Sequence, residues 1–174
     1  DQSGPTPLYK GQVNITASNN LFITARGAYV GNGFSLTPQG GMATTGYRDS
    51  GRVRHGSYVF YETKRPDHSF LADGNWIRGK HEIAFGGSWR RTKDDERQEF
   101  PGSGADNLHA ADFATSHRIQ AWLYRPFFAS SVGVNQSLYV GDTIRNGRLT
   151  AQLSLRYDRS YASMLESTQA AIPG

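Results

Sequence analysis

The sequence contains no cysteine, and this absence excludes disulfide scaffolds, cysteine zinc sites and catalysis by a thiol. It also contains no run near the roughly 18 apolar residues that a membrane-spanning helix needs. The second absence leaves one class of membrane protein open. A transmembrane β-strand needs only about 9–11 residues, and only alternate ones are apolar, so a barrel has a polar composition.

Other features are present only weakly. The hydrophobic fraction is 37% and the formal net charge is +4, with the densest basic group at residues 90–93. No nucleic-acid recognition motif accompanies these cations, so we expect no nucleic-acid partner. The first ten residues lack the basic and then apolar pattern of a signal peptide, and the last four (AIPG) form no terminating element. We therefore expect a piece of a longer protein.

The clearest pattern lies in residues 139–158, YVGDTIRNGRLTAQLSLRYD. In its second half, apolar side chains occupy every second position from Leu149 to Tyr157, and polar side chains occupy the positions between them. A period of two places successive side chains on opposite sides of a strand, so this segment predicts a strand with one apolar and one polar face. The preceding Asn146-Gly147 is the dipeptide that most readily forms a two-residue hairpin turn.

The same alternation predicts further strands over about 8–17, 21–29, 56–77, 81–90 and 117–144. We expect an interruption of the third near 64–67, because Pro66 cannot donate a ladder hydrogen bond, and a break in the last at Arg125-Pro126. The facing of 117–144 stays open. Leu138 and Val140 favour one side, but Asp142 shares that side, whereas Tyr139 favours the other.

The connections between these strands are of two kinds. Short turns lie at 18–20, 78–80 and 145–147, and long polar loops lie at 32–55 and 92–116. In an up-and-down meander, all the short turns then lie at one end and all the long loops at the other. Outer-membrane barrels have this asymmetry, with short periplasmic turns and long external loops.

The apolar faces are rich in glycine and alanine beside large aromatic residues. A sandwich core built from them would contain voids, each costing about 1 kcal/mol per missing methyl-sized volume, whereas acyl chains fill such gaps. The sequence therefore predicts an all-β, antiparallel up-and-down meander of about six strands, forming part of a transmembrane β-barrel over residues 1–174. The rival hypothesis is a secreted all-β carbohydrate-binding module with aromatic sugar platforms.

Three segments also carry a family resemblance. Residues 81–92 (HEIAFGGSWRRT), 101–104 (PGSG) and 139–160 (YVGDTIRNGRLTAQLSLRYDRS) resemble the barrel of TonB-dependent outer-membrane receptors. The closest resemblance is to the branch with a carboxypeptidase-regulatory-like N-terminal domain. Its strand motif G-x-H-E-(apolar)-x-F-G is matched by 79–86, and its hairpin motif Y-V-x-D-T…R-L-T…R-Y-D by 139–158. The likeness covers about residues 56–160.

The resemblance implies a fragment of a 22-strand barrel that encloses a plug domain, in the bacterial outer membrane. It implies energised uptake of an unidentified ligand by the parent protein, through an inner-membrane energy-transducing complex. The implied partners of this chain are the lipid bilayer, the plug and the remaining barrel strands. No plug is recognisable in these 174 residues.

The two faces give the candidate site residues. The polar faces would line the lumen; the candidates are Glu82, Arg90, Arg148, Gln152, Arg156 and Asp158. The apolar faces would meet lipid, with aromatic rings near the strand ends forming interfacial belts. These candidates are Tyr9, Tyr29, Trp76, Ile83, Phe85, Trp89, Leu153, Leu155 and Tyr157.

No catalytic, cofactor or metal site is predicted. The five histidines (55, 68, 81, 109 and 117) have no ligand-like spacing, and no serine or glycine motif supports catalysis or nucleotide binding. We therefore expect no enzyme. The acidic group Asp94, Asp95 and Glu96, with Asp106 and Asp112, could bind calcium, although a solvated charge run is the better interpretation.

Overall fold

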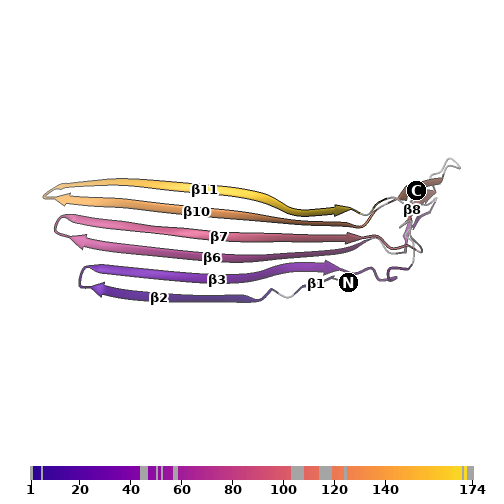
Figure 1. Cartoon of the computed structure of the whole chain (residues 1–174), viewed down its shortest axis with the longest axis horizontal. Coiled ribbons are helices and arrows are strands. Elements are labelled where there is room, and N and C mark those ends of the chain that lie inside the picture. Colours follow the sequence, from indigo (N-terminus) through magenta and orange to yellow (C-terminus); the bar gives the residue numbers. More distant parts are fainter. Residues whose placement is uncertain are drawn as a thin grey trace.

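The computed structural model is an all-β protein built around one long antiparallel sheet (Figure 1). It describes residues 2–4, 6–43, 47–49, 51, 53–56, 59–102, 108–113, 119–123, 125–169 and 171. Five strands carry the sheet, and their bounds are β3 (Leu21–Leu36), β6 (Phe60–Arg78), β7 (His81–Glu99), β10 (Phe127–Asn146) and β11 (Leu149–Gln169). β1 (Gln2–Ser3) and β2 (Leu8–Ser18) both pair with β3 along its other edge.

The strand order is a meander, β2-β3-β6-β7-β10-β11, in which every neighbour is antiparallel. This confirms the predicted all-β, antiparallel meander of six strands. Among the described residues, β2 and β11 do not pair with each other, so the sheet is open and has two free edges. A small second sheet of β5 (Arg54–His55), β4 (Tyr47–Arg48), β8 (Leu108–Phe113) and β9 (Ile119–Leu123) lies beyond the end that carries the long connections (Figure 1).

The strands extend further than the alternation predicts. β3 continues to Leu36 and β7 to Glu99, so the ranges 32–55 and 92–116, expected to be loops, begin in strand. They also contain β4, β5 and β8, three of the four strands of the second sheet. β11 continues to Gln169, well past the end of the apolar alternation at Tyr157. The expected interruption at 64–67 is found on one side of the strand only. The ladder between β6 and β7 skips Arg65 and Pro66 and then resumes in the same register. On the other side Pro66 still pairs with Gly31 of β3, so β6 continues through it.

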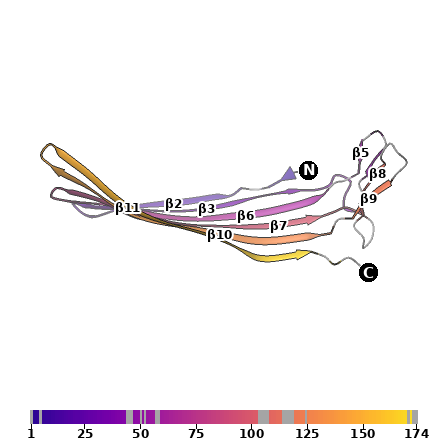
Figure 2. The ribbon, with the colours of Figure 1, turned by 90° about the horizontal axis from the view of Figure 1, so that it is seen from above.

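The sheet is a single curved layer without a conventional core (Figure 2). Among the described residues, only Phe100 and Val134 are buried hydrophobic side chains. Leu153 is 67% exposed and Leu155 is 73% exposed. The folding of this sheet therefore cannot rest on the burial of apolar surface within the described part of the chain.

Two of the three tight turns depend on a glycine with a left-handed backbone. Gly79 has φ 61° between β6 and β7, and Gly147 has φ 63° between β10 and β11. Residues with a Cβ adopt this conformation at a steric cost, which glycine avoids. The Asn146-Gly147 turn is thus formed where the sequence predicts it, and all three turns lie at one end of the sheet (Figure 1).

The three turns are staggered by a constant step. The last pair of the first hairpin, Ser18↔Leu21, lies in the cross-strand row of Trp76. The second hairpin ends two residues beyond Trp76, at Arg78↔His81. His81 in turn pairs with Ile144 of β10, and the third hairpin ends two residues beyond Ile144, at Asn146↔Leu149. Each step is two residues (about 6.6 Å) along the strands for every two strand spacings (about 9.6 Å) across them. The line of turns is therefore inclined by about 35° to the direction perpendicular to the strands.

Candidate functional site: the two faces of the sheet

One face of the sheet gathers the predicted apolar side chains from all six long strands, and we refer to it as the apolar face. Cross-strand partners lie on the same side of a sheet, so the pairing carries this face from strand to strand. One such row is Ile15, Ile23, Gly74, Phe85, Val140 and Leu155. The same register places every candidate lipid-facing or belt residue here. These are Tyr9, Tyr29, Trp76, Ile83, Phe85, Trp89, Leu153, Leu155 and Tyr157.

The register also decides the open question of β10. Val140 pairs with Phe85 and Leu155, so Leu138, Val140 and Asp142 lie on the apolar face and Tyr139 on the opposite one. Asp142 is accommodated there by His81, whose Nδ1 lies 2.6 Å from Asp142 Oδ2. The pair lies close to the turn end of the sheet. Residues 117, 118 and 124, which belong to the same open range of 117–144, lie outside the described residues.

Side chains from neighbouring strands cover some of the glycines in the apolar face. A Cβ on Gly74 would lie 2.4 Å from the ring of Phe85, and a Cβ on Gly87 would lie 2.7 Å from Leu138. Each of these glycines is directly opposite the side chain that covers it. Gly27, by contrast, has nothing within 4 Å of its Cβ position. Large side chains thus lie across the sheet surface and leave open space where small residues meet.

An aromatic residue closes the apolar face at a fixed distance from each turn. Tyr29 lies eight positions after Leu21, Trp89 eight after His81, and Tyr157 eight after Leu149. Because each of these strands begins at a turn, the line through the three rings is parallel to the line of turns. Eight residues span about 26 Å along a strand, which a 35° tilt reduces to a height of about 22 Å.

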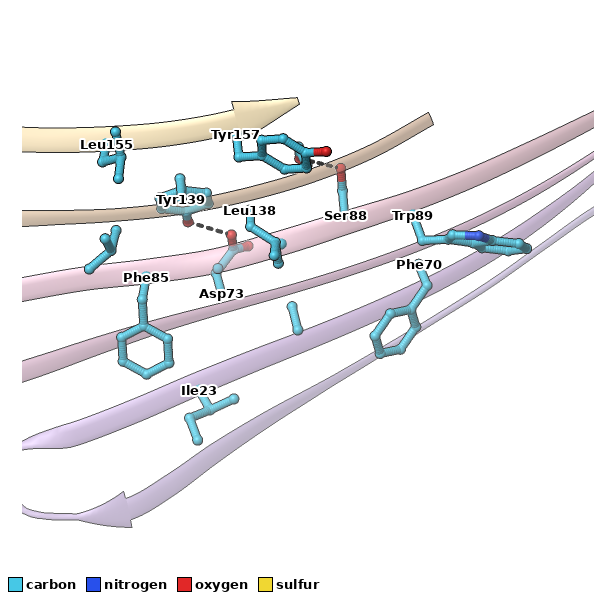
Figure 3. Close-up of a pocket in the computed structure, with 15 residues that line it drawn as sticks. Ile23, Phe70, Asp73, Phe85, Ser88, Trp89, Leu138, Tyr139, Leu155 and Tyr157 are labelled. Atoms are coloured by element: carbon cyan, nitrogen blue, oxygen red, sulfur yellow. Dashed lines mark hydrogen bonds between the residues drawn. The ribbon is translucent and has the colours of Figure 1, made fainter. Parts of the chain in front are cut away.

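The opposite face is polar and carries hydrogen-bonded groups from four strands; we refer to it as the polar face. Asp73 on β6 accepts a hydrogen bond from Tyr139 Oη on β10 (2.7 Å) and one from Arg26 on β3 (3.3 Å). Arg26 also donates to Gln12 on β2 (3.2 Å). Tyr139 crosses β7 to reach Asp73, and a Cβ on Gly86 would lie 2.8 Å from its ring. Glycine at position 86 therefore makes this contact possible (Figure 3).

Further along the same face, a second group of polar contacts continues toward the long connections. Asp67 on β6 accepts hydrogen bonds from Arg90 (2.7 Å) and Thr92 (2.6 Å) on β7. Asp94 accepts in the same way from Thr63 and Arg65, both at 3.1 Å. The polar face thus matches each of these carboxylates with a cation or a hydroxyl from a neighbouring strand.

The candidate lumen residues lie on or beside this face with mixed partners. Glu82 accepts from Arg145 (3.0 Å), Arg90 pairs with Asp67, and Arg156 pairs with Asp158 on its own strand (2.8 Å). Gln152 lies opposite Thr143, and Arg148 lies in the turn before β11. Sequence reasoning missed the residues at the centre of the network, Asp73 and Tyr139. Their contact joins positions 66 residues apart, and only the register brings them together.

The structure describes no metal centre. No group of three potential ligands occurs among the described residues. Asp94, Asp95 and Glu96, expected in a loop, lie in β7, and the strand period turns Asp95 away from the other two. Asp95 instead binds Lys93 (2.7 Å) and Ser130 (2.5 Å). Asp106 and the side chain of Asp112 lie outside the described residues, as do those of His109 and His117.

Comparisons with known proteins identify no relative. Neither protein-family models, nor curated proteins, nor solved structures match this chain. Within the described residues, no helix is both long and apolar enough to span a membrane.

Proposed function

We propose that this chain is a segment of a transmembrane β-barrel in a bacterial outer membrane, with the apolar face toward lipid and the polar face toward the lumen. The observation that carries the proposal is the pair of parallel lines across the sheet. The turns form one line and Tyr29, Trp89 and Tyr157 form the other, both inclined by about 35°. Strands of outer-membrane barrels tilt by about 35–45°, and their outward apolar band is about 25 Å tall.

A membrane explains this geometry because it is a slab of constant thickness. Tilted strands that cross a slab enter and leave it at positions that shift steadily from one strand to the next. The apolar band of this sheet behaves in this way: its height stays at about 22 Å, while the residues that bound it shift steadily from strand to strand. Two sheets packed in water impose no such slab, so the rival carbohydrate-binding sandwich gives no reason for the constant spacing of eight residues.

A second argument concerns what covers the apolar face. In a sandwich the second sheet would bury Leu153 and Leu155, which are 67% and 73% exposed here. Within the described residues, no second layer lies over them. Lipid acyl chains would cover this apolar surface without a second protein layer packed against it. The two free edges, at β2 and β11, would pair with further strands of a longer barrel.

The finer proposal is a receptor-transporter barrel that takes up a ligand with energy supplied through a plug. Its support is the resemblance of residues 79–86 and 139–158 to the barrel motifs of TonB-dependent receptors, together with the hydrogen-bonded polar face. On this face, charged and hydrogen-bonding side chains would point toward the lumen, where a plug would dock. They include Glu82, Arg90 and the Asp73–Tyr139 pair. The long connections between β3 and β6 and between β7 and β10 would face external ligands.

Single-cysteine labelling tests the orientation. This chain contains no cysteine, and any cysteine elsewhere in the full-length protein is replaced by serine. Leu155→Cys and Gln152→Cys place thiols on opposite faces of one strand. The full-length protein that carries this chain is expressed, the outer membranes are isolated, and a water-soluble maleimide is applied before and after denaturation in detergent. We expect the thiol of the Gln152→Cys variant to react in the intact membrane, and that of the Leu155→Cys variant to react only after denaturation.

Two results would refute the proposal. Recovery of the protein in the soluble secreted fraction would favour the carbohydrate-binding module. Equal labelling of both positions in the intact membrane would mean that β11 does not separate lipid from water. A third position, Leu153→Cys, lies on the same face as Leu155 and repeats the test two residues closer to the turn.

A further inference from the structure

Two arginines occupy the same place relative to the aromatic line. Arg91 lies two residues beyond Trp89 on β7, and Arg159 lies two residues beyond Tyr157 on β11. Both are therefore on the apolar face, on the side of the aromatic line that leads to the long connections. Because Trp89 and Tyr157 lie on one line parallel to the turns, Arg91 and Arg159 lie at one depth.

Neither guanidinium has a carboxylate partner among the described residues. Arg91 makes no hydrogen bond or ion pair there, and Arg159 lies over the ring of Tyr161, 5.2 Å from its centroid. The next carboxylate on this face of β7 is Asp95, which is already bound by Lys93 and Ser130. The two arginines thus present unneutralised positive charge beside an apolar surface. A guanidinium in this state matches a phosphate, which it can bind through two parallel hydrogen bonds.

The apolar face is hollowed on the turn side of these arginines. A hollow of about 660 Å³ extends from β3 across β6, β7 and β10 to β11, and its lining is almost entirely apolar (Figure 3). Its floor is formed where Ala72 meets Gly87, and its walls include Phe70, Phe85 and Leu138. Trp89 and Tyr157, the residues that precede the two arginines by two positions, belong to the same lining. A hydrocarbon chain in this hollow would therefore end beside the two guanidinium groups.

We propose that Arg91 and Arg159 bind a phosphate of lipid A while one of its acyl chains lies in the hollow. This rests on the proposed function, which places the long connections on the external side of the membrane. The lipid of that leaflet carries its phosphates on a sugar backbone directly above its acyl chains. The structure offers the matching order of groups along the sheet: first an apolar hollow, then aromatic rings, and then two arginines without a carboxylate partner among the described residues.

The test measures lipid binding to the full-length protein purified from outer membranes in mild detergent. Native mass spectrometry follows titration with bisphosphorylated lipid A, with the same lipid after removal of its phosphates, and with phosphatidylglycerol. The variant is R91A/R159A. The matched control is Arg97→Ala, on the same face of β7 but paired with Glu99 and six residues further from the hollow. R91K/R159K keeps the charges without the planar donors.

We expect R91A/R159A to bind bisphosphorylated lipid A about ten-fold more weakly or worse, because each charge-assisted contact contributes at least a factor of this order. Arg97→Ala should bind like the unmodified protein, and the lysine variant should fall between them. An equal loss with the dephosphorylated lipid would overturn the phosphate contact, and an equal loss with phosphatidylglycerol would overturn the choice of lipid A. Unchanged binding in R91A/R159A would overturn the site while leaving the barrel intact, whereas failure to find the protein in the outer membrane would refute the proposed function itself.

Discussion

At the scale of single residues, glycine decides which side chains can lie across the sheet. Gly86 allows Tyr139 to lie over β7 on the polar face and to donate to Asp73 on β6. On the apolar face, Gly74 accommodates the ring of Phe85 in the same way. Strand glycines usually weaken a sheet because they have no side chain to pack. Here a ring from the directly opposite residue takes the space that a Cβ would need.

This role predicts a difference between two glycines on the polar face. A Cβ at position 86 would lie 2.6 Å from the Ala72 carbonyl oxygen and 2.8 Å from the Tyr139 ring, whereas a Cβ at Gly133 meets nothing within 4 Å. We expect Gly86→Ala to lower the free energy of unfolding by about 1–3 kcal/mol, as overpacking does. Gly133→Ala should be neutral or slightly stabilising. Urea unfolding of the lipid-reconstituted protein measures both, and equal effects would contradict the role of Gly86.

A second prediction at this scale concerns pH and the connection between β3 and β6. Asp49 Oδ2 lies 2.7 Å from His55 Nε2, and Asp49 Oδ1 accepts from the Val53 amide (2.9 Å). The hydrogen bond with His55 and then that from Val53 hold the pKa of the Asp49 carboxyl below its usual value of 3.8. Because the pKa of Asp49 is lower in the folded than in the unfolded protein, its carboxylate stabilises this segment when the pH is above the unfolded-state pKa. This stabilisation is lost as the pH falls through the folded-state pKa.

We therefore expect the Val53 amide to be protected from hydrogen exchange at pH 5 and to lose protection in strongly acidic solution. Exchange followed by mass spectrometry, corrected for the intrinsic rate at each pH, measures this. Asp49→Asn removes the titrating group, so its protection should not depend on pH in this range. Protection that disappears at the same pH in both proteins would exclude Asp49 as the cause.

At the scale of elements, the alternation of residues predicted the strands where one face is apolar and failed where both faces are polar. Residues 81–90 alternate clearly, and the predicted strand is confirmed there. Residues 91–99 continue the same strand with charged side chains on both faces, so no hydrophobic period marks them. The second half of β11 is hidden for another reason, because apolar side chains stand at adjacent positions there, at 161–162 and 164–165, and mark no period of two. The predicted effect of Pro66 is confined to one ladder. Pairing with β7 is lost at Arg65 and Pro66, but β6 remains one strand because its pairing with β3 continues through them.

The candidate site was predictable as two faces but not as a set of contacts. Which residues share a face follows from a period of two, and the register of the sheet agrees with it at every candidate in β2, β3, β6, β7 and β11. Partners such as Arg145 for Glu82 depend on how two hairpins align, which no local pattern encodes. One signal in the sequence could have supplied that alignment, namely the constant eight residues from each turn to its aromatic residue.

A charge scan along β11 tests the two faces as an element. Leu155→Arg places a cation on the apolar face in the middle of the band and should cost roughly 2–4 kcal/mol of unfolding free energy in lipid. Gln152→Arg, on the polar face of the same strand, should cost far less. Leu153→Arg is the weaker probe because Asp142 lies directly opposite and would neutralise the new cation. Equal costs at 155 and 152 would show that β11 has no lipid-facing side.

At the scale of the whole molecule, the proposed barrel would account for both the open edges and the exposed apolar face. An open sheet with two long free edges is prone to pair with other chains in water. The constant stagger of the hairpins means that added hairpins would continue the same oblique lines and turn the sheet into a tilted cylinder.

The two tryptophans of β6 and β7 make the depth of the sheet measurable. Trp76 lies near the line of turns and Trp89 lies on the aromatic line, so in a bilayer each should lie near a different interface. Trp122 is replaced by phenylalanine in every variant. We expect variants that then retain only Trp76 or only Trp89 to be quenched more strongly by lipids brominated near the headgroup than by lipids brominated near the chain ends. A tryptophan introduced as Leu155→Trp should show the opposite preference, because residue 155 lies between the two lines. If all three tryptophans responded alike, or if none were quenched, the apolar face would not cross a bilayer, and the constant spacing of turns and rings would need another cause.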